Sequence, residues 1–92
     1  MVFNGSTSSS VSSTFFDNSV EIISFSLVNN SAGSLTVTAG IIEGSTLVNI
    51  YSGAIAANSS YQYTWAPIIV KRGTRIYVTS SGASISYYFS IK

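Results

Sequence analysis

The sequence predicts an all-β fold, a small antiparallel β-sandwich of about seven short strands. The sandwich is expected to be jelly-roll-like and to carry a Ser-rich N-terminal arm. Apolar and polar residues alternate along most of the chain, as in half-buried strands, and helical periodicity is nearly absent. Turn-forming residues recur about every 8 to 12 residues, which is typical of a sandwich or small barrel. With 92 residues and no cysteine, the chain is expected to be one domain that gains stability by oligomerisation.

The chain divides into two parts by composition. Residues 1–14 are rich in serine and contain few large apolar side chains, so we expect an N-terminal arm that is flexible or becomes ordered on a partner. Residues 15–92 are expected to form the single β-sandwich domain. Its expected strands, separated by turn clusters, are 15–16, 20–28, 34–42, 46–55, 61–65, 68–70, 75–78 and 83–92.

The alternation also predicts which side chains share an apolar face. Glu21 falls on the same face as the apolar residues that follow it, so a bulge or a strand edge is expected near Ile22. In three of the strands, the residues expected on the apolar face are Ile23, Phe25, Leu27, Leu35, Val37, Ala39, Ile41, Ala83, Ile85, Tyr87, Phe89 and Ile91.

The segment Trp65–Val78, WAPIIVKRGTRIYV, contains the only tryptophan, the only proline and three of the four basic residues. Pro67 cannot donate a backbone hydrogen bond, so it marks a break between strands. The apolar runs 68–70 and 75–78 flank a short polar stretch that contains Gly73, a residue able to adopt a positive φ. This pattern predicts a β-hairpin with Gly73 at its tip.

The composition argues against most catalytic chemistry. The chain has no histidine and no cysteine, the usual general base, nucleophile and transition-metal ligands. Its acids are Asp17, Glu21 and Glu43, and nothing in the spacing of Glu21 and Glu43 requires them to meet as a catalytic pair. The favoured interpretation is that Glu21 and Glu43 are solvated residues at strand ends. Because a carboxylate-rich loop and a Gly-rich phosphate loop are also missing, we expect no enzymatic activity, no metal and no cofactor.

Charge and hydropathy limit the partners. Charged residues make up 8% of the chain and the net charge is +1, too little for a nucleic-acid-binding surface. No apolar run reaches the roughly 18 residues of a membrane span. The N-terminal stretch lacks the features of a signal peptide, so we expect synthesis in the cytoplasm. A neutral, hydroxyl-rich surface suits a protein held within an assembly.

Three basic residues near the expected hairpin tip, Lys71, Arg72 and Arg75, form the first candidate binding site. Arginine can hold a carboxylate through two parallel hydrogen bonds, so this basic trio could dock on an acidic patch of a partner. The alternative, favoured for the trio taken alone, is that these charges serve solvation and discourage edge pairing.

Three aromatic residues, Tyr61, Tyr63 and Trp65, alternate along one face of a strand and form the second candidate site. Such side chains could stack against sugar rings or anchor a subunit interface, because they combine a large contact area with a polar group. We favour a place in the core or in a subunit interface over a sugar site.

The order of turns and strands resembles that of small β-sandwich virion proteins of tailed bacteriophages. A strand that ends in Asn and a Ser-rich turn precedes an aliphatic strand, a Gly-containing tip, an I-x-V strand and a Ser-Gly turn. The matching positions are Asn29, Asn30 and Ser31, then Ile68 to Val70, Gly73, Ile76, Val78, Ser81 and Gly82. The resemblance covers the chain from Val20 to the C-terminus.

This resemblance implies a capsid cement or decoration protein that binds the major capsid protein on the outer surface of the virion, commonly as a homotrimer. The basic trio and the N-terminal arm would then provide capsid contacts, while part of the aromatic face would lie between protomers. Related sandwiches at the distal ends of tailspikes and fibres imply an alternative, a carbohydrate-binding module that recognises a receptor. Neither role involves nucleic acid or a membrane.

Overall fold

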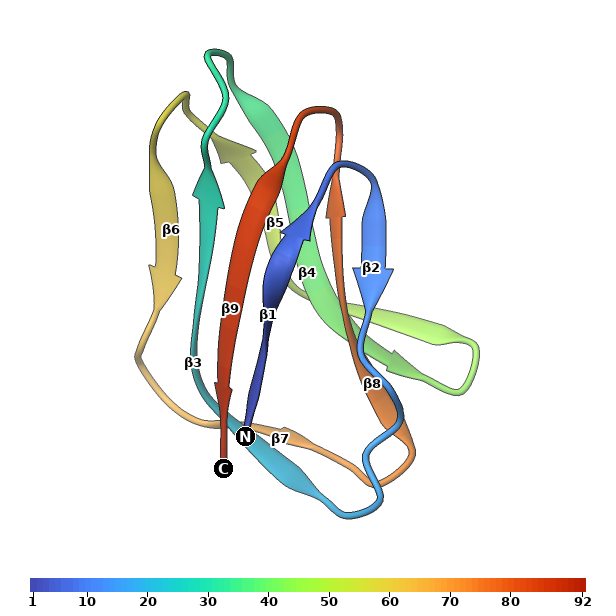
Figure 1. Cartoon of the computed structure of the whole chain (residues 1–92). Coiled ribbons are helices and arrows are strands. Elements are labelled where there is room, and N and C mark those ends of the chain that lie inside the picture. Colours follow the sequence, from blue (N-terminus) through green and yellow to red (C-terminus); the bar gives the residue numbers. More distant parts are fainter.

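The computed structural model describes residues 1–92 as strands, turns and loops, without a helix (Figure 1). No segment is therefore a helix that could cross a membrane. The strands are β1 (Val2–Thr7), β2 (Ser10–Ser12), β3 (Val20–Asn29), β4 (Leu35–Glu43), β5 (Thr46–Ile55), β6 (Ser60–Tyr63), β7 (Ile68–Val70), β8 (Thr74–Ser80) and β9 (Ile85–Ile91).

These strands form two antiparallel sheets that pack as a sandwich. One sheet has the order β1-β9-β3-β6, with the short β7 also pairing with β3, and the other has the order β2-β8-β4-β5. The pairs β1·β9, β2·β8, β3·β6 and β4·β5 are nested within one another, which is the strand order of a jelly roll. The prediction of a jelly-roll-like β-sandwich is confirmed, with nine strands in place of about seven.

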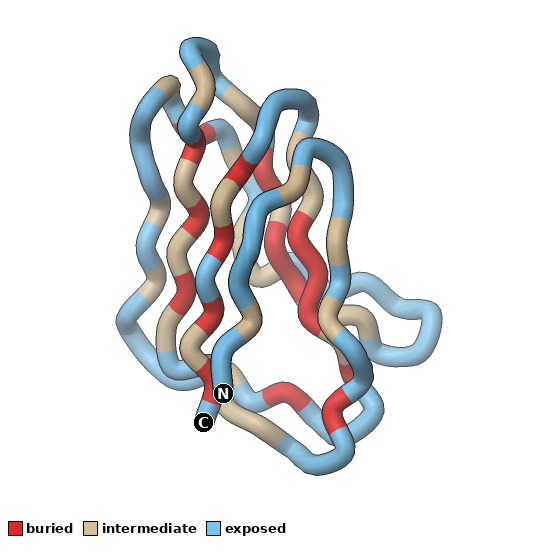
Figure 2. The backbone as a smooth tube through the Cα atoms, in the orientation of Figure 1, coloured by how far each residue is buried: buried red, intermediate tan, exposed pale blue.

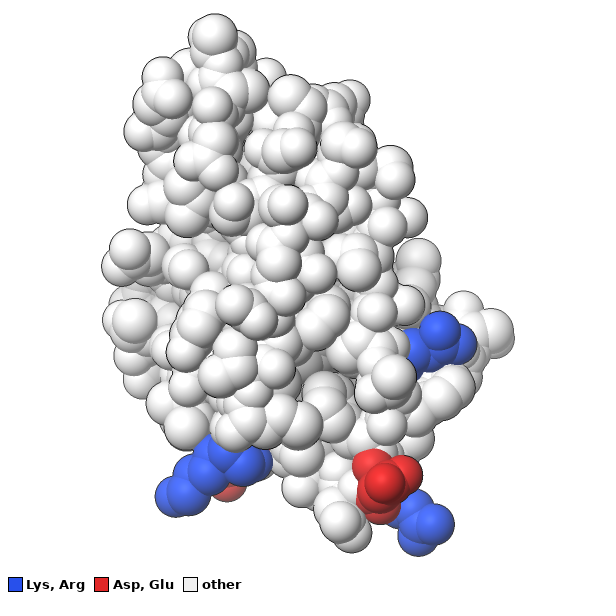
Figure 3. Space-filling model, in the orientation of Figure 1, with Lys and Arg blue, Asp and Glu red and all other residues white.

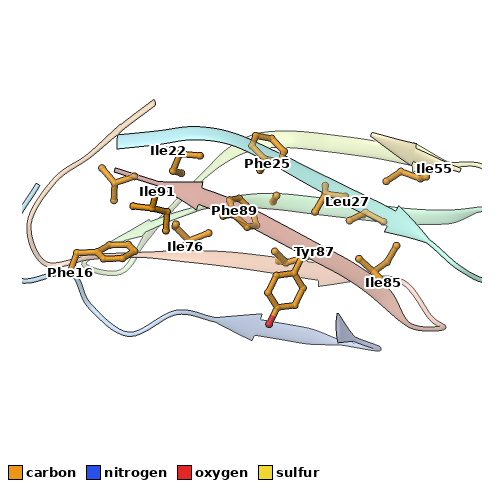
Figure 4. Close-up of a cluster of buried hydrophobic side chains, with 14 residues drawn as sticks. Phe16, Ile22, Phe25, Leu27, Ile55, Ile76, Ile85, Tyr87, Phe89 and Ile91 are labelled. Carbon is orange, nitrogen blue, oxygen red and sulfur yellow. The ribbon is translucent and has the colours of Figure 1, made fainter. Parts of the chain in front are cut away.

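The inner faces of the two sheets enclose a core of 14 buried residues. Buried and more exposed positions alternate along β3 and β9 (Figure 2), as the pleat requires. Phe25 and Phe89 stack with ring centroids 5.1 Å apart at the centre of the core (Figure 4). The inward positions expected on 34–42 and 83–92 are confirmed, except that Ala83 lies in an exposed turn and Leu35 and Ile41 are only half-buried.

A β-bulge changes the face of the first half of β3. The pairing between β3 and β9 shifts between Ile22 and Ser24, so the bulge expected near Ile22 is confirmed. Because of this shift, Ile22 is fully buried and Ile23 is 42% exposed. The expectation that Ile23 faces the core is therefore wrong.

Residues 1–14 do not form the expected arm. β1 pairs with β9 from Val2 to Thr7, and β2 pairs with β8 from Ser10 to Ser12. Phe3 and Val11 pack against the core, so few large side chains are enough when backbone hydrogen bonds supply the pairing. The strand expected at 15–16 is absent, and this loop buries Phe16 while Phe15 is exposed.

The segments 68–70 and 75–78 do not form a hairpin. β7 pairs with β3 and β8 pairs with β4 and β2, so the two segments belong to opposite sheets. The turn between them crosses from one sheet to the other, with Gly73 at a φ of 81°. The amide of Gly73 donates to the carbonyl of Phe16 at 2.8 Å, which ties this crossing to the loop before β3.

Candidate interaction surfaces

All side chains that are charged at neutral pH lie at one end of the sandwich. β3 and β8 begin at this end and β4 and β9 finish there, because neighbouring strands run antiparallel. The residues of this charged end are Asp17, Glu21, Glu43, Lys71, Arg72, Arg75 and Lys92. The loops of the opposite, neutral end are 8–9, 30–34, 56–59 and 81–84, and they contain no charged residue. Figure 3 shows this polarity on one face.

The structure places the basic trio together at the charged end, but each member has a different environment. The Lys71 ammonium lies 4.0 Å from a carboxylate oxygen of Glu43, and both side chains are largely exposed. The Arg75 guanidinium lies over the ring of Phe15, with its carbon 4.3 Å from the centroid, and its buried Nε has no hydrogen-bond partner. Arg72 is exposed in the turn and forms no ion pair. Arg72 is therefore the cation most available to a partner.

Glu21 and Glu43 do not lie on neighbouring strands. Glu21 is at the beginning of β3 and Glu43 is the last residue of β4, and these strands belong to opposite sheets. The backbone of Glu21 exchanges two hydrogen bonds with Lys92. No three side chains of the metal-ligating types come together in the structure.

The predicted aromatic face closes the sandwich between β5 and β6. Tyr61 stacks on Tyr51 of β5 with centroids 4.0 Å apart, which joins the two sheets at this edge. Tyr63 stacks on the core residue Phe25 at 5.2 Å. Both tyrosines are half-buried, so they line the margin of the core.

Trp65 differs from the two tyrosines because it follows the end of β6 and is 72% exposed. Its ring meets Tyr63 edge-on at 4.9 Å and lies 6.4 Å from Tyr61. The hydroxyl of Tyr63 donates to the carbonyl of Ala66 at 3.0 Å, which holds the loop that carries the indole. Trp65 is thus a large apolar surface supported by two rings and open to a ligand or partner.

Asn29 organises the neutral end, a role that its place at the end of an expected strand did not indicate. Its fully buried side-chain amide donates to the carbonyls of Gly33 at 2.9 Å, Ile55 at 2.9 Å and Ala56 at 3.2 Å. Its carbonyl oxygen accepts from the amide and the hydroxyl of Ser31. One side chain therefore joins the loops after β3 and β5.

A groove of about 300 Å³ lies on the outside of the four-stranded sheet. The sequence pattern did not predict it. Tyr77 lies in this groove and its hydroxyl donates to the side-chain oxygen of Asn49. Burial raises the pKa of the Tyr77 phenol above its ordinary value of 10.0. A Cβ at Gly40 would lie 2.2 Å from the carbonyl oxygen of Val48, so this position requires glycine. An isolated glycine within a strand was the available signal of this close approach.

Comparisons with known proteins bear on the fold. No protein-family model matches the sequence, and no curated protein matches it. Among solved structures, the chain is similar to the Anabaena sensory rhodopsin transducer, with a TM-score of 0.50 and 12% sequence identity. The match covers 82% of this chain and 89% of the other. At this identity the likeness concerns the β-sandwich architecture alone.

Proposed function

We propose that the protein is a non-enzymatic virion protein that decorates the outer surface of a phage capsid and reinforces it. The observation that carries this proposal is the polarity of the sandwich, with every charged side chain at one end and a neutral surface elsewhere. A decoration protein needs one end that recognises the shell, and an otherwise neutral surface is compatible with close packing in an assembly.

The architecture is consistent with this role. Jelly rolls are used by viral capsid proteins and by lectins, so the fold admits both the proposed function and its alternative. At the charged end, the exposed Arg72 is free to bind a carboxylate of the major capsid protein, and Lys71 would exchange its exposed contact with Glu43 for one with the shell. Binding across subunit boundaries would stabilise the assembled shell by mass action.

The test is co-sedimentation of the purified protein with capsids. We expect Arg72→Glu to raise the dissociation constant at least about tenfold, since a charge-assisted hydrogen bond contributes about 1.5 to 3 kcal/mol. The control is the double variant Ala83→Glu and Ser84→Glu, which changes the net charge equally but at the exposed neutral end. Absence of sedimentation by the unsubstituted protein would reject the proposed function.

Exposed Trp65 favours a second candidate function, a carbohydrate-binding module of a tail fibre or tailspike. An indole supported by Tyr61 and Tyr63 is a flat surface of the kind on which a sugar ring stacks. Titration with neutral cell-surface polysaccharides should then change the fluorescence of this single tryptophan. A flat response across a glycan panel would argue against this function.

A further inference from the structure

Of the strands at the sheet edges, β5 is the longest. β1 lies at one edge of the first sheet, β6 and the three-residue β7 lie at its other edge, and β2 and β5 are the outer strands of the second sheet. β5 has 10 residues, whereas β1, β6 and β2 have 6, 4 and 3. An edge strand presents unpaired backbone N–H and C=O groups, which form a template for pairing with another chain.

β5 carries few of the features by which proteins protect such an edge. The stretch Thr46–Ile55 contains no charged residue and no proline. Its one irregularity is a bulge, because the register with β4 shifts between Ala39 and Gly40. The β4–β5 hairpin projects beyond the body of the sandwich at this point (Figure 1). Next to the tip, which carries Glu43, Leu47 is 62% exposed and Val48 is 43% exposed.

Exposed Trp65 lies on the same side of the sandwich as β5. Tyr51 of β5 stacks on Tyr61, and Trp65 packs next to Tyr61. An open backbone edge and a largely exposed indole therefore occur along one margin of the molecule. Exposed apolar surface beside an open edge is a feature of protein interaction sites.

We propose that this margin binds a second copy of the chain, with the two β5 strands antiparallel about a two-fold axis. The two four-stranded sheets then become one continuous sheet of eight strands. The absence of charge in β5 argues for this occupant, because two identical edges meet without like-charge repulsion. In a two-fold contact every pairing occurs twice, residue i of one copy with residue j of the other and j with i, so the contact closes without further addition.

The area that a stable dimer must bury indicates that side chains outside β5 also take part in the contact. A strand of 10 residues is about 33 Å long, and the strip that it buries is smaller than the roughly 800 Å² per partner of a stable interface. Trp65 and the other side chains next to the β5 edge must supply the remaining area. The proposal concerns contact between copies of the chain and not contact with a capsid, so each can fail without the other.

Analytical ultracentrifugation over a range of protein concentrations tests the proposal. We expect a monomer–dimer equilibrium, accompanied by a blue shift of Trp65 fluorescence as the dimer forms. Ala54→Lys on β5 should raise the dimer dissociation constant at least about tenfold, which corresponds to about 1.4 kcal/mol. Thr36→Lys is the matched control, because Thr36 is the paired neighbour of Ala54, equally exposed but one strand inside the edge.

Three outcomes would overturn the proposal: a monomer at every concentration, a trimer, or a dimer that both lysine variants weaken equally. A trimer would instead agree with the oligomer that the sequence resemblance implies. Circular dichroism confirms that each variant is folded. Should Ala54→Lys not fold, Leu47→Lys next to the hairpin tip serves as the second edge variant.

Discussion

At the scale of single residues, buried polar side chains connect parts of the chain that are far apart in sequence. Asn29 contacts the loop after β3 and the end of β5, and Tyr77 of β8 contacts Asn49 of β5. A buried polar group is favourable only when its hydrogen bonds are satisfied, so each such residue depends on the correct position of its partners. Asn29 therefore fixes the positions of two loops at the neutral end, and Tyr77 fixes the position of β5 on the outer face of one sheet.

We expect Asn29→Ala to lower the free energy of unfolding by about 2 to 4 kcal/mol, because it removes the side-chain hydrogen bonds to the carbonyls of Ile55 and Ala56 and to the amide of Ser31. Denaturant unfolding provides the measurement. The control is Asn30→Ala, which removes one exposed hydrogen bond to Ser86 and should change stability by less than about 0.5 kcal/mol. Equal effects of the two variants would show that Asn29 does not organise the loops.

Tyr77 should make stability depend on pH in the alkaline range. Burial raises its pKa in the folded state above the ordinary value of 10.0, so folding favours the neutral phenol. This contribution is fully present below the unfolded pKa and is lost as the pH rises through the folded pKa. Unfolding midpoints should therefore fall more steeply at alkaline pH in the unsubstituted protein than in Tyr77→Phe. Parallel curves for the two proteins would contradict this assignment.

At the scale of elements, the N-terminal strands are the feature that the sequence concealed. The Ser-rich stretch suggests a mobile segment, yet the backbone of β1 pairs with residues 85–90 of β9. The single large side chain Phe3 anchors this strand, with its ring 4.9 Å from Tyr87 and 5.8 Å from Phe89. Pairing through the backbone depends little on the side chains, so hydroxyl-bearing residues serve as well as apolar ones on the outer face.

Phe3→Ala should lower the free energy of unfolding by about 2 kcal/mol, less than the 3 to 5 kcal/mol of a fully buried phenylalanine because Phe3 is half-buried. Asn4→Ala is the control, since the neighbouring Asn4 points to solvent from the same strand. Thermal and denaturant unfolding provide the measurement. A stability unaffected by Phe3→Ala would mean that residues 1–14 behave as the free arm that their composition suggested.

The Trp65–Val78 segment shows how one pattern fits two arrangements. Two apolar runs around a glycine turn are compatible with a hairpin, but they fit equally well when each run joins a different sheet. The choice depends on the partners of β7 and β8, namely β3 on one side and β4 and β2 on the other. Gly73 has a positive φ in either arrangement, which is why its turn was predicted correctly.

At the scale of the whole molecule, the antiparallel topology brings charged residues that are far apart in the sequence to one end of the sandwich. The charged residues are spread from Asp17 to Lys92 in the sequence, but every one lies near a strand terminus at the same end. A body of this kind is able to orient on a charged surface, because electrostatic interactions act mainly on one of its ends. The basic trio identified from the sequence is one part of this end.

The proposed binding to a capsid through the charged end should weaken with salt. Between about 0.1 M and 1 M ionic strength the Debye length falls from about 10 Å to about 3 Å, so exposed contacts of Lys71 and Arg72 are screened. Co-sedimentation at both salt concentrations measures the effect, and Arg72→Glu should reduce the salt dependence. Affinity that is independent of salt would indicate that a neutral face of the sandwich makes the contact.

The sequence by itself determined the properties that depend on neighbours along the chain. The alternation of side chains in β4 and β9, the bulge near Ile22 and the turn at Gly73 follow from the pleat of one strand or from the φ of one residue. The tertiary structure alone decided which strands pair, that residues 2–7 join β9, and that Asn29 connects two loops. Strand pairing depends on backbone hydrogen bonds between distant residues, which are nearly independent of side-chain identity, and the Asn29 side chain contacts loops that only this pairing brings together. The gathering of all charges at one end follows from the same pairing, so only the folded chain reveals it.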